Sequence, residues 1–328
     1  MAVTTKDIAR ICGLSRTTVD RALHNKGRIK ESTRIKVLTT AKELGYQPDL
    51  LARSLVKGIS MCIGVIVVDL NNQYFPLMVD AMEREAKKAG YLLNITLSEG
   101  NGGTEKELIR NLLGHRVDGI IIAPVDWTPD YITYLENLPV PVVVIGHTET
   151  DKIKCVGNDE YAAAAEATQY IIRKGYRHLA FVAPSNADEK LINVAGHKQR
   201  LNGFLDTVKK ETGITHTVLL EEDFCRKAEE LVINGKEKIA FLCSGEVFAH
   251  QMLIQLGKNG LNPPRNYGLM GFDSLEVFKD WKPAITTIDN HIPEIGRSTF
   301  SLIYRMIKGD EELDNITIPY KIIQGETL

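Results

Sequence analysis

The chain has 328 residues, enough for two or three domains, and its 44% hydrophobic and 25% charged residues are typical of a globular protein. Its five cysteines stand at irregular spacing with no CxxC pair, which excludes a disulfide framework and argues against a structural metal. No apolar run approaches the roughly 18 residues of a membrane helix and the first residues are polar, so we expect a cytoplasmic protein without a membrane partner.

The net charge of −2 hides an asymmetry between the two ends of the chain. Residues 1–58 carry 12 Lys and Arg against 5 Asp and Glu, whereas the remainder carries 28 against 37. This division fits a small nucleic-acid-binding head on an acidic body.

Residues 4–28 predict two short helices joined by a tight turn. Thr4 is followed three residues later by Asp7, which predicts a helix N-cap with a carboxylate that reaches back to it. Gly13 is expected to end this helix and Ser15 to cap the next one. The predicted apolar faces are Ile8, Ala9, Ile11 and Cys12 in the first helix and Val19, Ala22 and Leu23 in the second.

Two helices of this kind make a helix-turn-helix, whose second helix would lie in a DNA major groove. A plain helical hairpin without DNA contacts is the alternative interpretation. A third amphipathic helix, from Glu31 to Leu44 and ended by Gly45, follows. Its expected apolar side comprises Ile35, Val37, Leu38, Ala41 and Leu44.

The order of motifs in these residues closely resembles the N-terminus of the LacI/GalR family of bacterial transcription regulators. The matching motifs are K-D-I-A from Lys6, G-L-S-x-x-T-V-x-R-A-L from Gly13, E-L-G-Y-Q-P from Glu43 and A-R-S-L from Ala52. The resemblance implies a DNA-binding domain at 1–48 and a hinge helix with a linker at 49–60. The expected DNA contacts are Thr5, Ser15, Arg16, Thr17, Arg21, His24, Asn25, Ala52 and Leu55.

Two positions in this part bear on DNA recognition. Asp20 stands where the family usually has Ser, and phosphate repels a carboxylate on the recognition helix, so the operator preference of other members does not carry over. Leu55 matches the leucine that the family wedges into the minor groove, where unstacking is offset by bending DNA onto more protein. The alternative is that Leu55 is a linker leucine that packs on the body.

From Met61 on, apolar runs alternate with helical stretches. Residues 63–68 are a continuous, largely β-branched run, as in a strand buried on both faces. Strand–helix–strand repeats with short connections imply parallel sheets flanked by helices. The further predicted strands are 91–97, 117–124, 141–146, 178–184, 217–221, 239–245, 267–273 and 286–290, and the predicted helices are 75–89, 104–114, 129–137, 160–174, 195–211, 225–234, 246–258 and 293–308.

This body resembles that of the LacI family and of periplasmic sugar-binding proteins over 61–328. The resemblance implies an effector-binding and dimerisation domain of two lobes. Lobe 1 would span about 61–159 and 291–317, and lobe 2 about 160–290 and 318–328. The chain would cross between them near 158–160, 289–292 and 317–320, and the helix 293–308 would return to lobe 1.

Ligands of open parallel sheets bind beyond the carboxyl ends of the strands, so the residues after each strand are candidates for a binding site. Rings that stack on C–H faces, together with carboxylates and amides that bind hydroxyls, suit a polyhydroxylated ligand. The candidates are Asp69, Asn72, Tyr74, Phe75, Asp126, His147, Phe224, Ser244, Asp273 and Asn290, with Trp127 beside them.

The resemblance adds Arg200, because Q-R-L-N-G-F matches the family's R-x-x-G-F motif for a ligand arginine, and it also supports Asp273 and Asn290. A surface arginine is the alternative for Arg200, and core packing is the alternative for Tyr74 and Phe75. Three departures each remove a hydrogen-bonding group from the cleft: Gly146-His147 replaces the common Asp-Arg, Ser244-Gly245 replaces Asn-Asp, and Ala123 precedes Pro124. We therefore expect a sugar, polyol or related metabolite in an unusual pose.

The sequence thus predicts a repressor rather than an activator, a homodimer with a tetramer as the alternative, and a near-palindromic operator in double-stranded DNA. A small-molecule effector would set operator affinity, and the residues leave open whether it releases DNA or promotes binding. No G-x-G-x-x-G follows the first strand and no P-loop or nucleophile set is present, so we expect no enzyme, no cofactor and no metal. A solute-binding protein or a sugar-modifying enzyme with an added DNA-binding head is the alternative.

Overall fold

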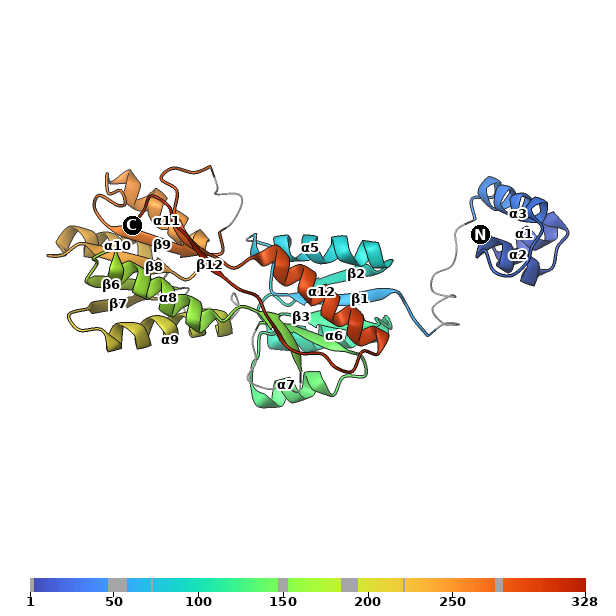
Figure 1. The fold of residues 1–328 in the computed structure, drawn as a ribbon, viewed down its shortest axis with the longest axis horizontal. Helices are drawn as coiled ribbons and strands as arrows, with labels where there is room; N and C mark the ends of the chain where they lie inside the picture. The colour runs from blue at the N-terminus through green and yellow to red at the C-terminus, as the bar shows by residue number, and fades with distance from the viewer. Residues whose placement is uncertain are drawn as a thin grey trace. The chain divides into compact units, whose positions relative to one another are not determined.

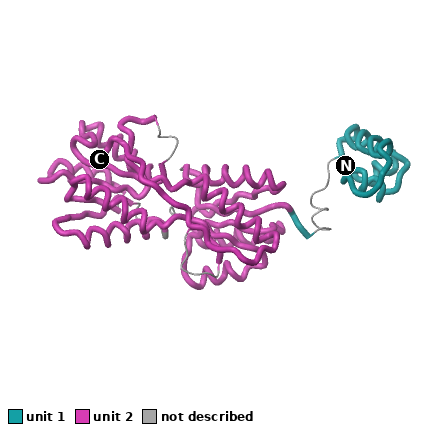
Figure 2. The backbone as a smooth tube through the Cα atoms, in the orientation of Figure 1, with its two compact units in different colours: residues 1–60 teal, residues 61–328 magenta. Residues whose placement is uncertain are grey.

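The structure is a computed structural model, and it describes residues 3–46, 58–71, 73–146, 153–183, 194–220, 222–274 and 280–328. The chain divides into two compact units, residues 1–60 and residues 61–328 (Figure 2). The hinge residues 49–57, including Ala52 and Leu55, lie outside the described residues, as do Asn72 and His147.

The first unit contains three helices, α1 (Thr5–Cys12), α2 (Arg16–Leu23) and α3 (Glu31–Glu43), which confirms the predicted helices. The predicted capping box at Thr4 and Asp7 is present, and Gly13 ends α1 in the left-handed conformation. The core comprises Ile8, Ala9, Cys12, Val19, Ala22, Val37 and Ala41. Ile11, Ile35 and Leu38 are 41–56% exposed, so the predicted apolar faces were too wide for a unit this small to bury.

The second unit consists of two lobes, each built on a six-stranded sheet (Figure 1). The strands are β1 (Cys62–Val67), β2 (Leu92–Leu97), β3 (Gly119–Ile122), β4 (Val142–Ile145), β5 (Lys154–Gly157), β6 (His178–Val182), β7 (Thr215–Leu219), β8 (Ile239–Cys243), β9 (Gly268–Phe272), β10 (Thr286–Asp289), β11 (Ile316–Thr317) and β12 (Lys321–Ile323). The helices are α5 (Tyr74–Ala89), α6 (Gly102–Gly114), α7 (Pro129–Glu136), α8 (Glu160–Arg173), α9 (Val194–Lys210), α10 (Phe224–Asn234), α11 (Glu246–Lys258) and α12 (Ile292–Lys308).

The two sheets share one strand order. Lobe 1 has β2-β1-β3-β4-β5-β11 and lobe 2 has β7-β6-β8-β9-β10-β12. The strands of lobe 1 pair in parallel, and the predicted strands of lobe 2 do so as well, while the short β12 runs antiparallel to β10. Strands β5, β11 and β12 were not predicted, because runs of two to four residues give little periodicity to read.

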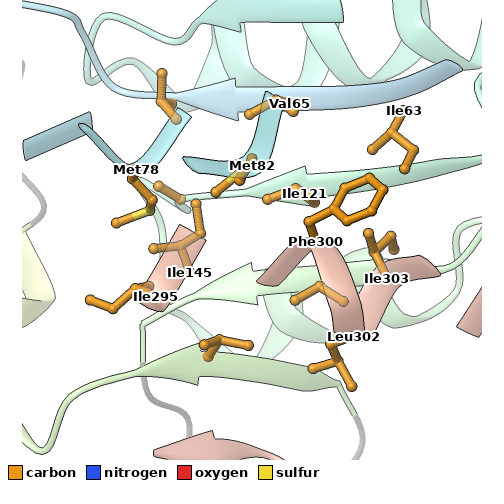
Figure 3. Packing of buried hydrophobic residues seen from close by; sticks show 14 of the residues in the cluster. Ile63, Val65, Met78, Met82, Ile121, Ile145, Ile295, Phe300, Leu302 and Ile303 are labelled. Atoms are coloured by element: carbon orange, nitrogen blue, oxygen red, sulfur yellow. The ribbon is translucent and has the colours of Figure 1, made fainter. Parts of the chain in front are cut away.

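Helices cover both faces of each sheet, which explains why the strands read as continuous apolar runs. In lobe 1, Ile63 and Val65 of β1 and Ile121 of β3 pack with Met78 of α5 and Ile303 of α12 (Figure 3). Alternate residues of the same strands face α6 and α7. Helix α12 therefore packs on the sheet of lobe 1. In lobe 2, α8 and α9 cover one face and α10 and α11 the other.

The chain passes between the lobes three times: after β5, after β10 and after β11. The buried side chain of Asn158, at the first passage, donates hydrogen bonds to the main-chain oxygens of Asn290 (3.2 Å) and Ile318 (2.9 Å), at the other two. His291, in the left-handed conformation at the start of α12, bonds the oxygen of Pro319 through Nδ1 at 2.8 Å. The three passages are thus held together by side-chain hydrogen bonds.

Candidate functional site

The second helix of the first unit is fixed at its start and exposes its polar side. Ser15 caps α2 by accepting a hydrogen bond from the Thr18 N–H at 3.1 Å. Arg16 donates from Nε to the Thr5 hydroxyl at 3.3 Å, which joins the start of α2 to the start of α1. Four of the predicted DNA contacts, Ser15, Arg16, Thr17 and Arg21, are exposed along this side.

Asp20 and two further predicted DNA contacts, His24 and Asn25, lie at the end of the same helix. His24 is half-buried, and its Nδ1 lies 2.9 Å from the main-chain oxygen of Asp20 and 3.3 Å from Oδ1 of that residue. The Asp20 carboxylate thus has a partner on its own helix. Asn25 follows, exposed and in the left-handed conformation that asparagine tolerates better than most residues.

In the second unit, Arg200 of α9 lies at the centre of a buried polar cluster. The guanidinium is 5% exposed and makes two hydrogen bonds to Glu160, Nε to Oε2 at 2.6 Å and Nη2 to Oε1 at 3.1 Å. Nη1 donates to the main-chain oxygen of Ser244, and Nη2 donates to Oδ1 of Asp273 at 3.3 Å. Its plane lies over the Phe272 ring, 4.3 Å from the centroid. The surface alternative for Arg200 is therefore excluded by its burial.

Glycine in the same motif positions Arg200. A Cβ added to Gly203 would lie 2.3 Å from the main-chain oxygen of Tyr161, so only glycine permits α9 to lie this close to α8. The neighbouring Phe204 is fully buried beside Phe181, which anchors α9 on the sheet. Close packing of the two helices brings Arg200 within reach of Glu160 at the first turn of α8.

The predicted residues Ser244, Asp273 and Asn290 all belong to this cluster. They follow β8, β9 and β10, so the rule that places sites beyond strand ends brings them together. Asn290 donates from Nδ2 to Oδ1 of Asp273 at 2.9 Å. Oγ of Ser244 and Oδ1 of Asn290 are buried polar atoms without a hydrogen-bond partner, which makes them candidates for a ligand or bound water.

Asp273 occupies an unusual backbone conformation, with φ at +93°, and Ser274 follows with φ at +47°. Non-glycine residues in this region store strain of about 1–3 kcal/mol and cluster at functional sites. Burial raises the pKa of the Asp273 carboxyl above its ordinary value, against the opposing charge of Arg200. The carboxylate of Asp273 is thus strained and desolvated, and it lies beside the positively charged guanidinium of Arg200.

Lobe 1 contributes Tyr74, at the start of α5. Burial, together with the charges of Glu160 and Asp273, raises the pKa of the Tyr74 hydroxyl. Phe75 is 4% exposed in the core of lobe 1 and meets the Tyr74 ring edge-on at 5.2 Å. The core-packing alternative thus describes Phe75, and the half-buried Tyr74 also packs against that core.

An aromatic group borders the cluster in lobe 2. Phe224 packs edge-on against Phe248 at 5.9 Å, and Phe248 against His197 at 6.5 Å. Burial, together with the charge of Arg200, lowers the pKa of His197 to about 3, and its Nδ1 is buried without a partner. His197 is therefore neutral, and no sequence pattern had selected it as a candidate.

The remaining candidates of lobe 1 bind their own loops. Asp69 accepts a hydrogen bond from the Asn71 N–H at 2.7 Å, and Asp126 accepts one from the Thr128 N–H at 2.8 Å. Gly146 replaces the family's usual aspartate, and a Cβ there would lie 2.8 Å from the Trp127 ring. The tryptophan ring thus occupies the space that a side chain at position 146 would need.

Glu160 is the residue of the cluster that sequence reasoning missed. It lies at the end of the first predicted passage between lobes, and the strand-end rule did not reach it because β5, the strand before that passage, was not predicted. Over the ranges that the structure describes, no group of three or more His, Cys, Asp or Glu side chains could hold a metal ion. No helix among the described residues has the length and apolar character needed to span a membrane.

With this geometry in place, comparison with known proteins gives consistent matches. Residues 60–326 match the model of periplasmic binding proteins and sugar binding domain of LacI family, and residues 4–49 match that of bacterial regulatory proteins, lacI family. The chain is 29% identical to catabolite control protein A of Priestia megaterium over 98% of both chains. It is 27% identical to the HTH-type transcriptional repressor PurR of Vibrio campbellii, over 94% of this chain and 93% of that one.

Among solved structures, the chain is similar to the lac repressor dimer bound to operator and the anti-inducer ONPF. The TM-score is 0.88 at 20% identity, over 100% of this chain and 99% of that one. This likeness shows a shared fold, and the matches to the two family models go further. The chain belongs to the LacI family of bacterial regulatory proteins, with a helix-turn-helix head followed by a periplasmic-binding-protein-like body.

Proposed function

We propose that the chain is a sequence-specific DNA-binding transcriptional repressor whose operator affinity is set by a small molecule bound between the two lobes. The buried cluster around Arg200, in a chain that begins with a helix-turn-helix, carries the proposal. The relative PurR is a repressor, and the lac repressor was solved with both operator DNA and a small molecule, which supports the pairing of the two functions.

We assign DNA binding to the first unit and effector binding to the second. Residues 1–48 bind DNA, residues 49–60 form the hinge, and residues 61–328 bind the effector and form a homodimer. A two-fold dimer reads two half-sites, so the operator is a near-palindrome in double-stranded DNA. Its place of action is the cytoplasm, where that DNA lies. Base edges are contacted by the exposed Arg16, Thr17 and Arg21. The DNA phosphate backbone is contacted, or these three side chains are supported, by Thr5, Ser15, His24 and Asn25.

The effector is a neutral, hydroxyl-rich molecule, and the charges of the cluster supply the reason. Arg200 already makes four hydrogen bonds to protein acceptors, so it has little left to offer an anion. One guanidinium stands against the carboxylates of Glu160 and Asp273, which leaves the cluster with net negative charge. Within the described residues, the side-chain hydrogen bonds to Asp273 both end on Oδ1, so Oδ2 is available to a ligand hydroxyl.

A thermal-shift screen tests this proposal on the full-length protein. The panel pairs neutral monosaccharides and polyols with their phosphate esters, since a ligand that binds only the native state raises the melting temperature. We expect a neutral member to raise it and its phosphate ester not to. Asp273→Ala should abolish the shift, while Asp280→Ala, which removes an exposed carboxylate of lobe 2, should keep it. A shift from the phosphate esters alone would contradict the effector class, and a shift unchanged in Asp273→Ala would contradict the site.

A further inference from the structure

Glu105, in the first turn of α6, is a fully buried carboxylate outside the Arg200 cluster. Its Oε2 accepts a hydrogen bond from the main-chain N–H of Val125 at 3.0 Å, and its Oε1 accepts one from the hydroxyl of Tyr131 on α7. One side chain therefore joins the start of α6, the start of α7 and the segment between β3 and α7. Residues 125–128 are called the β3–α7 segment below.

The β3–α7 segment carries the two lobe 1 candidates Asp126 and Trp127. Asp126 turns back onto the N–H of Thr128, and the Trp127 ring packs against Gly146 at the carboxyl end of β4. Each side chain follows Val125 by one or two residues within a short turn. The hydrogen bond from Val125 to Glu105 therefore helps to determine where both side chains lie.

The surroundings of Glu105 make its proton count sensitive to pH. The charged and titratable groups that act on it are Lys106 on α6, Asp126 on the β3–α7 segment and Tyr131 on α7. Tyr134 lies beside Tyr131, with ring centroids 5.8 Å apart. Burial raises the pKa of Glu105 to about 7, and the nearby Asp126 acts in the same direction. The hydrogen bonds from Tyr131 and Val125 and the charge of Lys106 oppose this rise.

We propose that Glu105 is a positioning residue that holds the β3–α7 segment at the effector cleft through hydrogen bonds that change with its protonation. The carboxylate accepts from both Val125 and Tyr131. When a proton from solvent binds Oε1, that oxygen becomes a donor to the Tyr131 oxygen, and the phenol hydrogen loses its acceptor. The segment and α7 then shift relative to α6. The inference rests on the proposed function only in placing this segment beside the effector cleft.

Tryptophan fluorescence tests the inference without an effector. The chain has two tryptophans, and the ring of Trp281 lies 5.2 Å from that of His250, whose own titration would alter its emission. The full-length Trp281→Phe variant leaves Trp127 as the reporter of the segment. We expect its emission to change between pH 5 and 9 with a midpoint near pH 7.

Three variants in this background decide the cause. Glu105→Gln should abolish the transition, while Glu107→Gln, which changes an exposed carboxylate of the same helix, should keep it. Tyr131→Phe should raise the midpoint, because the lost hydroxyl bond had favoured the charged form, and this variant keeps the proposal testable if Glu105→Gln fails to fold. An unchanged transition in Glu105→Gln, an unmoved midpoint in Tyr131→Phe, or no transition in the parent would each overturn the inference. None of these results depends on the effector site at Arg200, so the two proposals fail separately.

Discussion

The side-chain amide of Asn158 donates a hydrogen bond to the main-chain oxygen of Asn290, 132 residues later in the chain, at 3.2 Å. The second hydrogen of the same amide bonds the main-chain oxygen of Ile318 at 2.9 Å. One buried side chain thus connects all three passages between the lobes. A change in lobe geometry, which any effector response requires, must bend the chain at residues that Asn158 holds in register.

Asn158→Ala should lower the free energy of unfolding by about 1–3 kcal/mol, because two main-chain oxygens lose their donor in a buried place. Urea unfolding of the full-length protein measures this loss. Asn137→Ala is the matched control, since that asparagine also bonds a main-chain oxygen, at 2.7 Å, but on an exposed helix end. Equal losses in the two variants would remove the special role of Asn158.

Gly203→Ala should destabilise the protein and disturb the Arg200 cluster, since its Cβ would lie 2.3 Å from the Tyr161 oxygen and force α9 away from α8. Gly257→Ala, in α11, is the control. Its Cβ would meet only the Asn262 side chain, at 3.8 Å, so the better helix propensity of alanine should raise stability by up to about 1 kcal/mol. Melting temperatures of the two variants should move in opposite directions. A rise in both would show that the helices can separate at no cost.

Arg200→Ala should cost about 3–5 kcal/mol, because it leaves the carboxylates of Glu160 and Asp273 buried without their cation. The loss should shrink as the pH falls, since burial raises the pKa of the Asp273 carboxyl and its protonation removes uncompensated charge. Arg226→Ala, which breaks two ion pairs on an exposed helix face, should leave the melting temperature unchanged. A destabilisation by Arg200→Ala that is the same at pH 5 and pH 8 would mean that lost packing, not charge, is responsible.

The fold and most of the Arg200 cluster could be predicted from the sequence, because both depend on which residues follow one another along the chain. Apolar runs fixed the buried strands, and the strand-end rule selected Ser244, Asp273 and Asn290, whose side chains the fold brings together. Glu160 was missed because a glutamate after a helix cap is ordinary in sequence. Only the close approach of α9, which Gly203 allows, makes it the partner of Arg200.

Other features lay beyond sequence patterns for equally physical reasons. Glu105 and Tyr131 lie 26 residues apart in the sequence and on different helices, and no periodicity predicts such a contact. Ile11 and Ile35 have the spacing of core residues, yet three short helices cannot cover them. The glycine at position 146 is understood only from the structure, which shows that the Trp127 ring lies where its Cβ would be.

Arg21→Ala should weaken operator binding by about 1–3 kcal/mol and affect non-specific DNA less, because we propose that this exposed arginine contacts base edges. Titrations on a site selected from a random DNA library and on scrambled DNA measure the two effects. Lys87→Ala, on the body, is the control for general loss of charge and should change neither. Equal losses on both DNAs would assign Arg21 to phosphate contacts.

The most direct test of the account is the operator affinity of the full-length protein with and without the neutral sugar or polyol that raises its melting temperature. A coupling of about 1–3 kcal/mol between the two sites predicts a change of 5- to 150-fold for the native chain. Asp273→Ala should bind the operator as tightly as the native chain without sugar, because the head is untouched, and should show no change when sugar is added. An unchanged affinity of the native chain at saturating sugar, or a normal response in Asp273→Ala, would contradict the account.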